Sequence, residues 1–193
     1  MLWINLLRIT VPGIVLGAWL GKLLSEKPQY LNLINPSYWL ESAKRSSKDK
    51  FLRIFFLSIL FGGLVFLVEW GVGNILTDLF GPLLSEENIF TGIAQFSLIL
   101  FFLSITIFPI IEEWVFRGIL LEEITQMSQS KWIGLFSSAL LFALFHLSNP
   151  GTYPIAVIFY FVGGLVIGGS YLVGGLTVAA LSHIIYNLLP FLL

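Results

Sequence analysis

Residues 93–117 read IAQFSLILFFLSITIFPIIEEWVFR. The part before Glu112 carries no charged residue, and a helix crosses a bilayer with roughly 20 mostly apolar residues. The stretch 93–112 therefore predicts a transmembrane helix. Two adjacent carboxylates, Glu112 and Glu113, follow directly, and Arg117 comes four residues after Glu113. The apolar run indicates the class of fold, and the charges at its end indicate where chemistry is to be sought.

The composition of the whole chain agrees with a membrane protein. Of the 193 residues, 57% are hydrophobic and 11% are charged, whereas soluble domains have about 25% charged residues. The mean hydropathy is +0.93. This excludes a disordered chain, a nucleic-acid binder and an ordinary cytosolic enzyme. The chain has no cysteine, which excludes disulfides and cysteine-ligated metals.

Six stretches have the length and apolarity of a membrane span. They are residues 2–24, 53–76, 93–112, 132–148, 152–173 and 176–193. The last two are the hardest to separate, and Gly174-Gly175 is the expected break between them, because paired glycines loosen a helix. The sequence thus predicts an all-α fold, a polytopic membrane helical bundle of about six transmembrane helices.

The basic residues predict how the bundle is oriented. Seven of the ten Lys and Arg residues lie in or beside the polar segment 25–52, whereas the 77–92 loop has acidic residues and no basic one. The positive-inside rule places 25–52 in the cytoplasm, where it can contact anionic membrane lipid. A change of composition near residue 92 predicts two parts: a two-helix N-terminal segment, 1–92, and a polar-site-bearing core, 93–193.

The first ionisable cluster lies at the end of the 93–112 stretch. Placing a charged side chain at the bilayer centre costs at least ~2.5–3.5 kcal/mol on insertion scales. A charged residue inside a predicted span is therefore expected to have a specific role. Glu113 and Arg117 are at i and i+4 on a helix and are expected to pair. Glu112 is then left without a local partner and is a candidate general base. The alternative is an interfacial charge cluster where the helix leaves the bilayer.

Two further polar motifs lie in later spans. The only two histidines of the chain occur in Phe142-x-x-x-His146 and His183-x-x-x-Asn187. Either motif alone is also compatible with a structural histidine or with polar helix packing. A turn near Gln129 lies 17 residues from both Glu112 and His146, so the two are expected at one height in a helical hairpin. Carboxylates, two histidines and an amide are together the parts of a hydrolytic site.

These motifs resemble those of a known family, the CPBP intramembrane proteases. This family, also called the Abi family, is named after CAAX proteases and bacteriocin-processing proteins, and it is marked by EExxxR, FxxxH and HxxxN or HxxxD on separate helices. The sequence has all three in that order: Glu112-Glu113-x-x-x-Arg117, Phe142-x-x-x-His146 and His183-x-x-x-Asn187. The resemblance covers roughly residues 92–192.

The resemblance implies a role for each matched residue. Glu112 would activate the attacking water, His146 would position that water or carry a proton, and His183 and Asn187 would line the site, with Asn187 stabilising the oxyanion. Three further motif residues would support them: Glu113 and Arg117, which hold Glu112 in place, and Phe142.

The resemblance leaves the use of a metal open. Glu112, His146 and His183 would be an adequate Zn²⁺ set with water as fourth ligand. However, HxxxN is not the HExxH motif of soluble zinc proteases. The interpretation favours a glutamate protease without a cofactor.

Three classes of function fit these residues. The first is an intramembrane endopeptidase for a peptide or membrane-protein substrate. The second is a non-catalytic scaffold or assembly factor that retains the fold and has a membrane-protein complex as partner. The third is a small transporter, since intramembrane Glu and His also form proton relays, although no inverted repeat is visible. The host membrane is open between a prokaryotic plasma membrane and a thylakoid.

Overall fold

The computed structural model describes residues 2–37, 39, 47–81, 93, 95–148 and 154–192. The middle of the basic segment 25–52, with Lys44 and Arg45, and most of the predicted 77–92 loop lie outside the described residues. The side of the membrane on which each loop lies and the division of the chain near residue 92 stay predictions.

The described residues are almost entirely helical and contain no strand. The elements in chain order are α1 (Leu2–Glu26), η1 (Pro28–Ile34), α3 (Lys48–Phe80), α5 (Leu98–Glu113), η3 (Trp114–Leu121), α6 (Glu122–Ser128), α7 (Lys131–His146), α8 (Ala156–Leu188) and η4 (Leu189–Phe191). Within the described part of the chain, three continuous helical stretches are long and apolar enough to cross a membrane: Lys48–Phe80, Leu98–Ser128 and Ala156–Phe191. The prediction of an all-α helical membrane bundle is confirmed, whereas the number of about six transmembrane helices stays a prediction.

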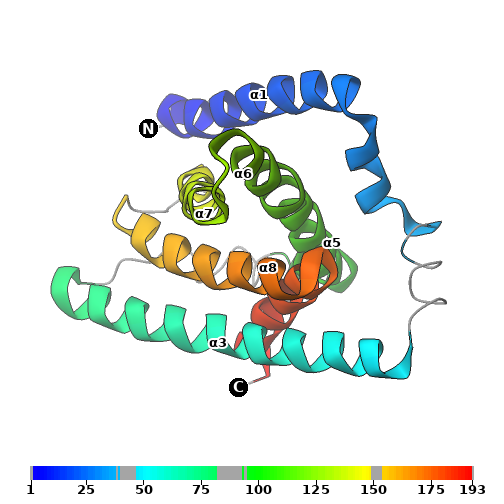
Figure 1. Ribbon diagram of the computed structural model, residues 1–193. Coiled ribbons are helices and arrows are strands. Elements are labelled where there is room, and N and C mark those ends of the chain that lie inside the picture. Colours follow the sequence, from blue (N-terminus) through cyan, green and yellow to red (C-terminus); the bar gives the residue numbers. More distant parts are fainter. Residues whose placement is uncertain are drawn as a thin grey trace.

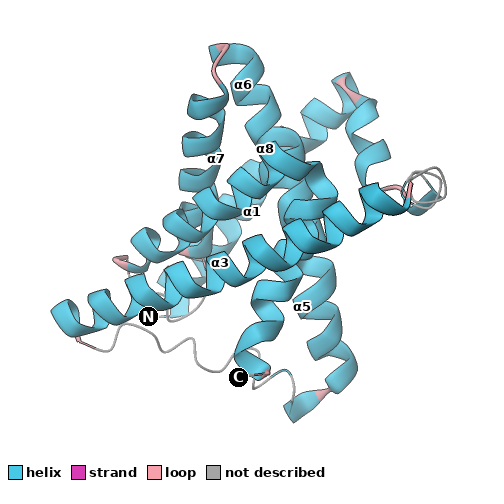
Figure 2. Cartoon of the chain, turned by 60° about the horizontal axis from the view of Figure 1, so that its bottom comes forward, coloured by secondary structure: helices cyan, strands magenta, loops and turns pink. Residues whose placement is uncertain are grey.

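The helix α8 occupies the centre of the bundle. It packs against α3 on one side and against α5, η3 and α7 on the other. Figure 1 shows α8 between α3 and the group formed by α6 and α7, with α1 beyond that group, and Figure 2 shows the same arrangement from another side. The site residues predicted from the sequence therefore lie on elements that meet at α8.

The third predicted span continues beyond its expected end. Residues Leu98–Ser128 form one uninterrupted helical stretch, so Glu112 and Glu113 do not lie where a helix ends. Pro109 removes a backbone donor, and eight residues in π-helical geometry follow, Trp114–Leu121, all of them buried. Gln129, with φ 56°, ends the stretch, which is the turn predicted near that residue.

The last two predicted spans meet at the predicted break. Residues 156–173 and 176–188 lie on either side of Gly175, where φ is 75° and ψ is −171° and the helix is interrupted by a kink. The break expected at Gly174-Gly175 is confirmed, and the label α8 covers the helices on both sides of it. In Figure 1 the final part of the chain leaves the direction of α8 at this point. Beyond the bend, His183 contacts Glu113 of α5.

The N-terminal helix is attached to the bundle through η1. Lys27 Nζ lies 2.6 and 2.8 Å from the two carboxylate oxygens of Glu123, and the Tyr30 hydroxyl donates to the same carboxylate. The indole nitrogen of Trp114 donates to the Tyr30 carbonyl at 2.9 Å. Burial and the Glu123 carboxylate raise the pKa of Tyr30. These contacts hold α1 against the elements that carry the candidate site.

Candidate active site

A buried ion pair lies at the centre of the site. Arg117 Nη1 donates to Oε1 of Glu113 at 3.0 Å, and both side chains are fully buried. The i,i+4 pair expected from the sequence is therefore present. Arg117 Nη2 also donates to the Gly164 carbonyl at 2.9 Å, and the guanidinium carbon lies 4.5 Å from the centre of the Phe142 ring. Arg117 thus connects its own helix to α7 and α8.

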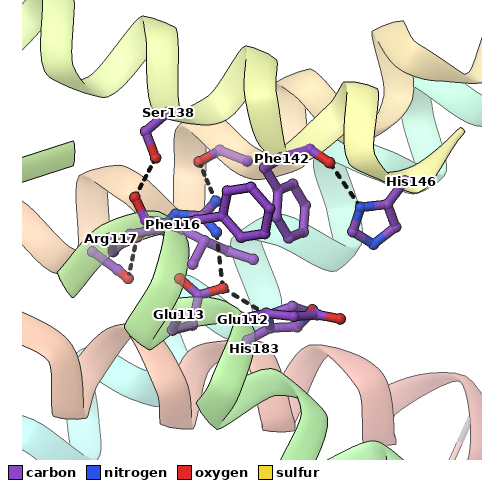
Figure 3. A network of polar contacts seen from close by, with 11 residues as sticks. Glu112, Glu113, Phe116, Arg117, Ser138, Phe142, His146 and His183 are labelled. Carbon is purple, nitrogen blue, oxygen red and sulfur yellow. Dashed lines mark hydrogen bonds and ion pairs between the residues drawn. The ribbon is translucent and has the colours of Figure 1, made fainter. Parts of the chain in front are cut away.

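His183 lies between the two adjacent carboxylates. Its Nδ1 is 2.8 Å from Oε1 of Glu113, and its Nε2 is 3.8 Å from Oε2 of Glu112. Figure 3 shows the imidazole beside both glutamates. The resemblance implies that Glu113 and Arg117 hold Glu112 in place. In the structure the two side chains contact each other, and they also reach His183 and the Gly164 carbonyl. Glu112 is 29% exposed, so it is the accessible carboxylate of the pair.

The proton on His146 can be placed from its hydrogen bond. Nδ1 lies 2.9 Å from the Phe142 carbonyl oxygen, which can only accept, so Nδ1 carries the proton. In neutral His146 the other nitrogen, Nε2, then has the lone pair and can take up a proton. The ring packs between Phe142 and Tyr160, with centroids at 4.3 and 4.4 Å.

Phe142 joins the histidine side of the site to the ion pair. Its ring contacts the rings of His146 and Phe116, lies 6.0 Å from that of His183 and faces Arg117. The structure therefore brings together six of the seven residues singled out from the sequence: Glu112, Glu113, Arg117, Phe142, His146 and His183.

Asn187, the seventh of these residues, is more loosely connected to the others. It lies one helical turn after His183 in α8 and is half-buried. Within the described residues, no hydrogen bond involves its side chain. Its role in the site stays a prediction.

The π-helical turns explain how η3 meets α7. Widened turns leave carbonyls outside the regular helical pattern, and such turns are frequent at functional sites. The Phe116 carbonyl in η3 accepts a hydrogen bond from Ser138 Oγ of α7. This contact, drawn in Figure 3, lies beside the Phe116–Phe142 ring pair. The local distortion thus fixes the element carrying Glu112 and Glu113 against the element carrying His146.

The histidine and carboxylate donors do not fit a metal site as placed. Among the described residues, no three His, Asp, Glu or Cys side chains are arranged to hold a metal ion. We therefore derive no chemical step through a metal.

A comparison with family models identifies the second half of the chain. The model described as "Type II CAAX prenyl endopeptidase Rce1-like" matches residues 94–189. Residues 94–189 are thus similar to the Rce1-like family. All three motifs lie inside the matched segment, which confirms the resemblance to CAAX-type membrane proteases. Comparisons with curated proteins and with solved structures found no match.

The similarity of residues 94–189 to the Rce1-like family supports a CAAX-type intramembrane protease at the level of the family. The apolar helices of the bundle agree with a membrane protein.

One buried acidic residue was missed by the sequence analysis. Glu69 is the only charged residue between Arg53 and Asp78 in α3, and it is 4% exposed. The argument that an ionisable residue inside a span needs a reason applies to it directly. It was missed because it belongs to no motif and lies outside the segment 94–189.

Proposed function

We propose that the protein is an intramembrane endopeptidase in which Glu112 activates the attacking water. The observation that carries the proposal is the difference between the two adjacent carboxylates. Glu113 is fully buried and engaged by Arg117 and His183, whereas Glu112 is partly exposed and faces His183 Nε2 at 3.8 Å. A general base must reach a water molecule, and of these two carboxylates Glu112 has the required access.

The proposed reaction proceeds by addition and elimination at the scissile carbonyl. Glu112 takes a proton from water as the water oxygen attacks the carbonyl carbon, and the carbonyl oxygen becomes an oxyanion. Asn187 and, when Nε2 is protonated, His183 donate hydrogen bonds to that oxygen. Collapse of the intermediate breaks the carbon–nitrogen bond, and the amine leaves with the proton taken from water. His146 Nε2 can relay that proton.

Glu113 and Arg117 have a supporting part in this proposal. Because Glu113 is a carboxylate, it accepts the Nδ1 proton of His183 and so fixes the orientation of the ring. Arg117 compensates the charge of Glu113, which would otherwise be buried without a cation. Phe142 separates the two imidazoles and packs against both.

An apolar pocket supports a substrate with an apolar group. The pocket has a volume of about 320 Å³ and is lined by residues of α1, η3 and α7: Pro12, Val15, Leu16, Trp19, Phe116, Leu120, Leu141, Leu144 and Phe145. The Phe116 ring contacts those of Phe145 and Phe142 and so connects the pocket to Phe142. We propose a peptide or membrane-protein substrate, with a prenylated CAAX peptide as the first probe because of the family's description.

The orientation in the membrane is also proposed. A multi-pass protein with the segment 25–52 in the cytoplasm follows from the positive-inside rule. The host membrane would be a prokaryotic plasma membrane or a thylakoid. We propose a reaction without a metal, since the described donors do not form a three-ligand group.

The test compares the purified protein with its Glu112→Gln variant. An internally quenched prenylated CAAX peptide is the substrate, and a search for altered membrane-protein termini in cells extends the test to other substrates. Loss of general-base catalysis is expected to lower the rate at least ~10²-fold. A scaffold would instead keep its cellular function when Glu112 is replaced by Gln. Full complementation of a deletion strain by Glu112→Gln at normal abundance would contradict the proposal.

A further inference from the structure

Glu69 lies at the interface between α3 and α8, at the level of the site. Residues along the two helices pair in antiparallel order: Gly73 faces Phe159, Glu69 faces Gly163, and Val65 belongs to one buried cluster with Ile167. The contacts one turn to either side of Glu69 are thus apolar packing. A carboxylate is not needed to hold these two helices together, since its neighbours in α3 do so without charge.

The carboxylate of Glu69 lies directly over the backbone of Gly163. A Cβ atom built on Gly163 would overlap Oε1 of Glu69, and the three heavy atoms nearest to that position all belong to Glu69. The absence of a side chain at position 163 therefore permits this approach. Any larger residue there would displace the carboxylate.

The next residue of α8 faces the candidate active site. The Gly164 carbonyl accepts from Arg117 Nη2 at 2.9 Å, and a Cβ on Gly164 would lie 3.3 Å from Phe142 Cδ1. Two consecutive glycines thus contact Glu69 on one side of α8 and the Arg117–Phe142 pair on the other. At these two glycines, only the backbone of α8 lies between Glu69 and the Arg117–Phe142 pair.

The same turn of α8 also supports His146. Tyr160 precedes Gly163 by three positions and Gly164 by four, so the three are neighbours on the helix surface. The Tyr160 ring is buried and stacks on the His146 imidazole at 4.4 Å and 30°. A shift of α8 at Gly163 would therefore change both the acceptor of Arg117 and the ring that packs against His146.

We propose that Glu69 is a positioning residue of the active site, which fixes α8 at Gly163 so that Gly164 meets Arg117 and Tyr160 packs against His146. This inference rests on the proposed function. It assigns to a helix outside the matched segment 94–189 a part in holding the site.

The test uses the two histidines of the chain as reporters. Protein labelled with ¹⁵N-histidine gives imidazole signals from His146 and His183 alone, and a His146→Gln variant assigns them. This measurement needs no substrate. We expect Glu69→Ala to shift the His146 signals, and Glu69→Gln, which keeps the size and most hydrogen-bonding capacity, to leave them near the wild-type positions.

Two further variants separate positioning from general loss of packing. Val65→Ala removes buried volume from the same interface one turn away, and it is expected to lower thermal stability without moving the His146 signals. Gly163→Ala leaves Glu69 in the sequence but displaces its carboxylate, and it is expected to shift His146 as Glu69→Ala does. The double variant Gly163→Ala, Glu69→Ala is expected to match Glu69→Ala.

Cleavage of the prenylated CAAX peptide gives a second readout. Misplacement of catalytic groups by about 1 Å can cost 10²-fold, so Glu69→Ala is expected to lower kcat per folded molecule about 10- to 100-fold with KM unchanged. Unshifted His146 signals in Glu69→Ala or Gly163→Ala, or equal shifts in Val65→Ala or Glu69→Gln, would overturn the inference. Retained cleavage by Glu112→Gln would instead overturn the proposed function, whatever the His146 signals show.

Discussion

His183 Nδ1 lies 2.8 Å from Oε1 of Glu113, across 70 residues of sequence. The same oxygen accepts from Arg117 at 3.0 Å. Glu113 therefore joins the guanidinium of Arg117 to the imidazole of His183 in α8. The adjacent Glu112 is 29% exposed, and its carboxylate lies 3.8 Å from His183 Nε2. Two identical side chains, one residue apart, have different surroundings and are expected to respond differently to the same substitution.

The first prediction compares Glu113→Gln with Glu112→Gln. Replacing Glu113 leaves the guanidinium of Arg117 buried without its anionic partner, and breaking such a pair costs about 3–5 kcal/mol of unfolding free energy. Replacing Glu112 removes a carboxylate with partial exposure and is expected to leave stability unchanged or slightly improved. Thermal denaturation of both variants in one detergent measures the difference. Equal stability of the two variants would contradict the division of roles.

The second prediction concerns Arg117. Lysine at this position can still pair with Glu113, but it lacks the planar fork that bonds the Gly164 carbonyl and faces Phe142. Arg117→Lys and Arg117→Ala are expected to lower activity or stability without abolishing turnover, because Arg117 is not assigned to the reacting atoms. The measurement is cleavage rate per folded molecule, with Lys131→Ala as an exposed control. Complete loss of turnover in a well-folded Arg117→Lys variant would show a direct catalytic role.

The sequence predicted the helical class and the local pair, since both depend on spacing along one chain segment. Apolar runs predict helices, and the i,i+4 spacing predicts the Glu113–Arg117 contact. The turn at Gln129 and the bend at Gly175 also followed from local signals.

The sequence could not predict the contacts between distant elements. The bond from Glu113 to His183 depends on the direction of the last part of α8, which the bend at Gly175 sets. The π-helical turns after Pro109 carry no simple sequence signal. The predicted third span therefore ends at residue 112, whereas the helical stretch continues to Ser128. The partner of Glu69 could not be inferred because Gly163 is one of many glycines in an apolar stretch.

The third prediction concerns metal dependence. Dialysis of the purified protein against a chelator is expected to leave cleavage of the probe peptide intact, and elemental analysis is expected to find less than one Zn²⁺ per chain. A structural readout accompanies activity: the ¹⁵N signals of His146 and His183 are expected to be unchanged by added Zn²⁺. Zn–N distances near ~2.0–2.1 Å to both imidazoles in an experimental structure would contradict this prediction.

The last prediction concerns Gly175. Its φ of 75° and ψ of −171° fall in a region that is essentially restricted to glycine, and another residue there costs about 1–3 kcal/mol. A Cβ at this position would meet nothing within 4 Å, so Gly175→Ala tests backbone conformation without a steric clash. If α8 straightens to relieve the strain, the part carrying His183 moves away from Glu113 and Glu112. We therefore expect lower thermal stability together with a shifted His183 imidazole signal and unchanged His146 signals. Gly169→Ala, another glycine of α8 with open space at Cβ, is the control and is expected to change neither. A Gly175→Ala variant with wild-type stability and an unmoved His183 signal would show that the bend does not hold His183 in the site.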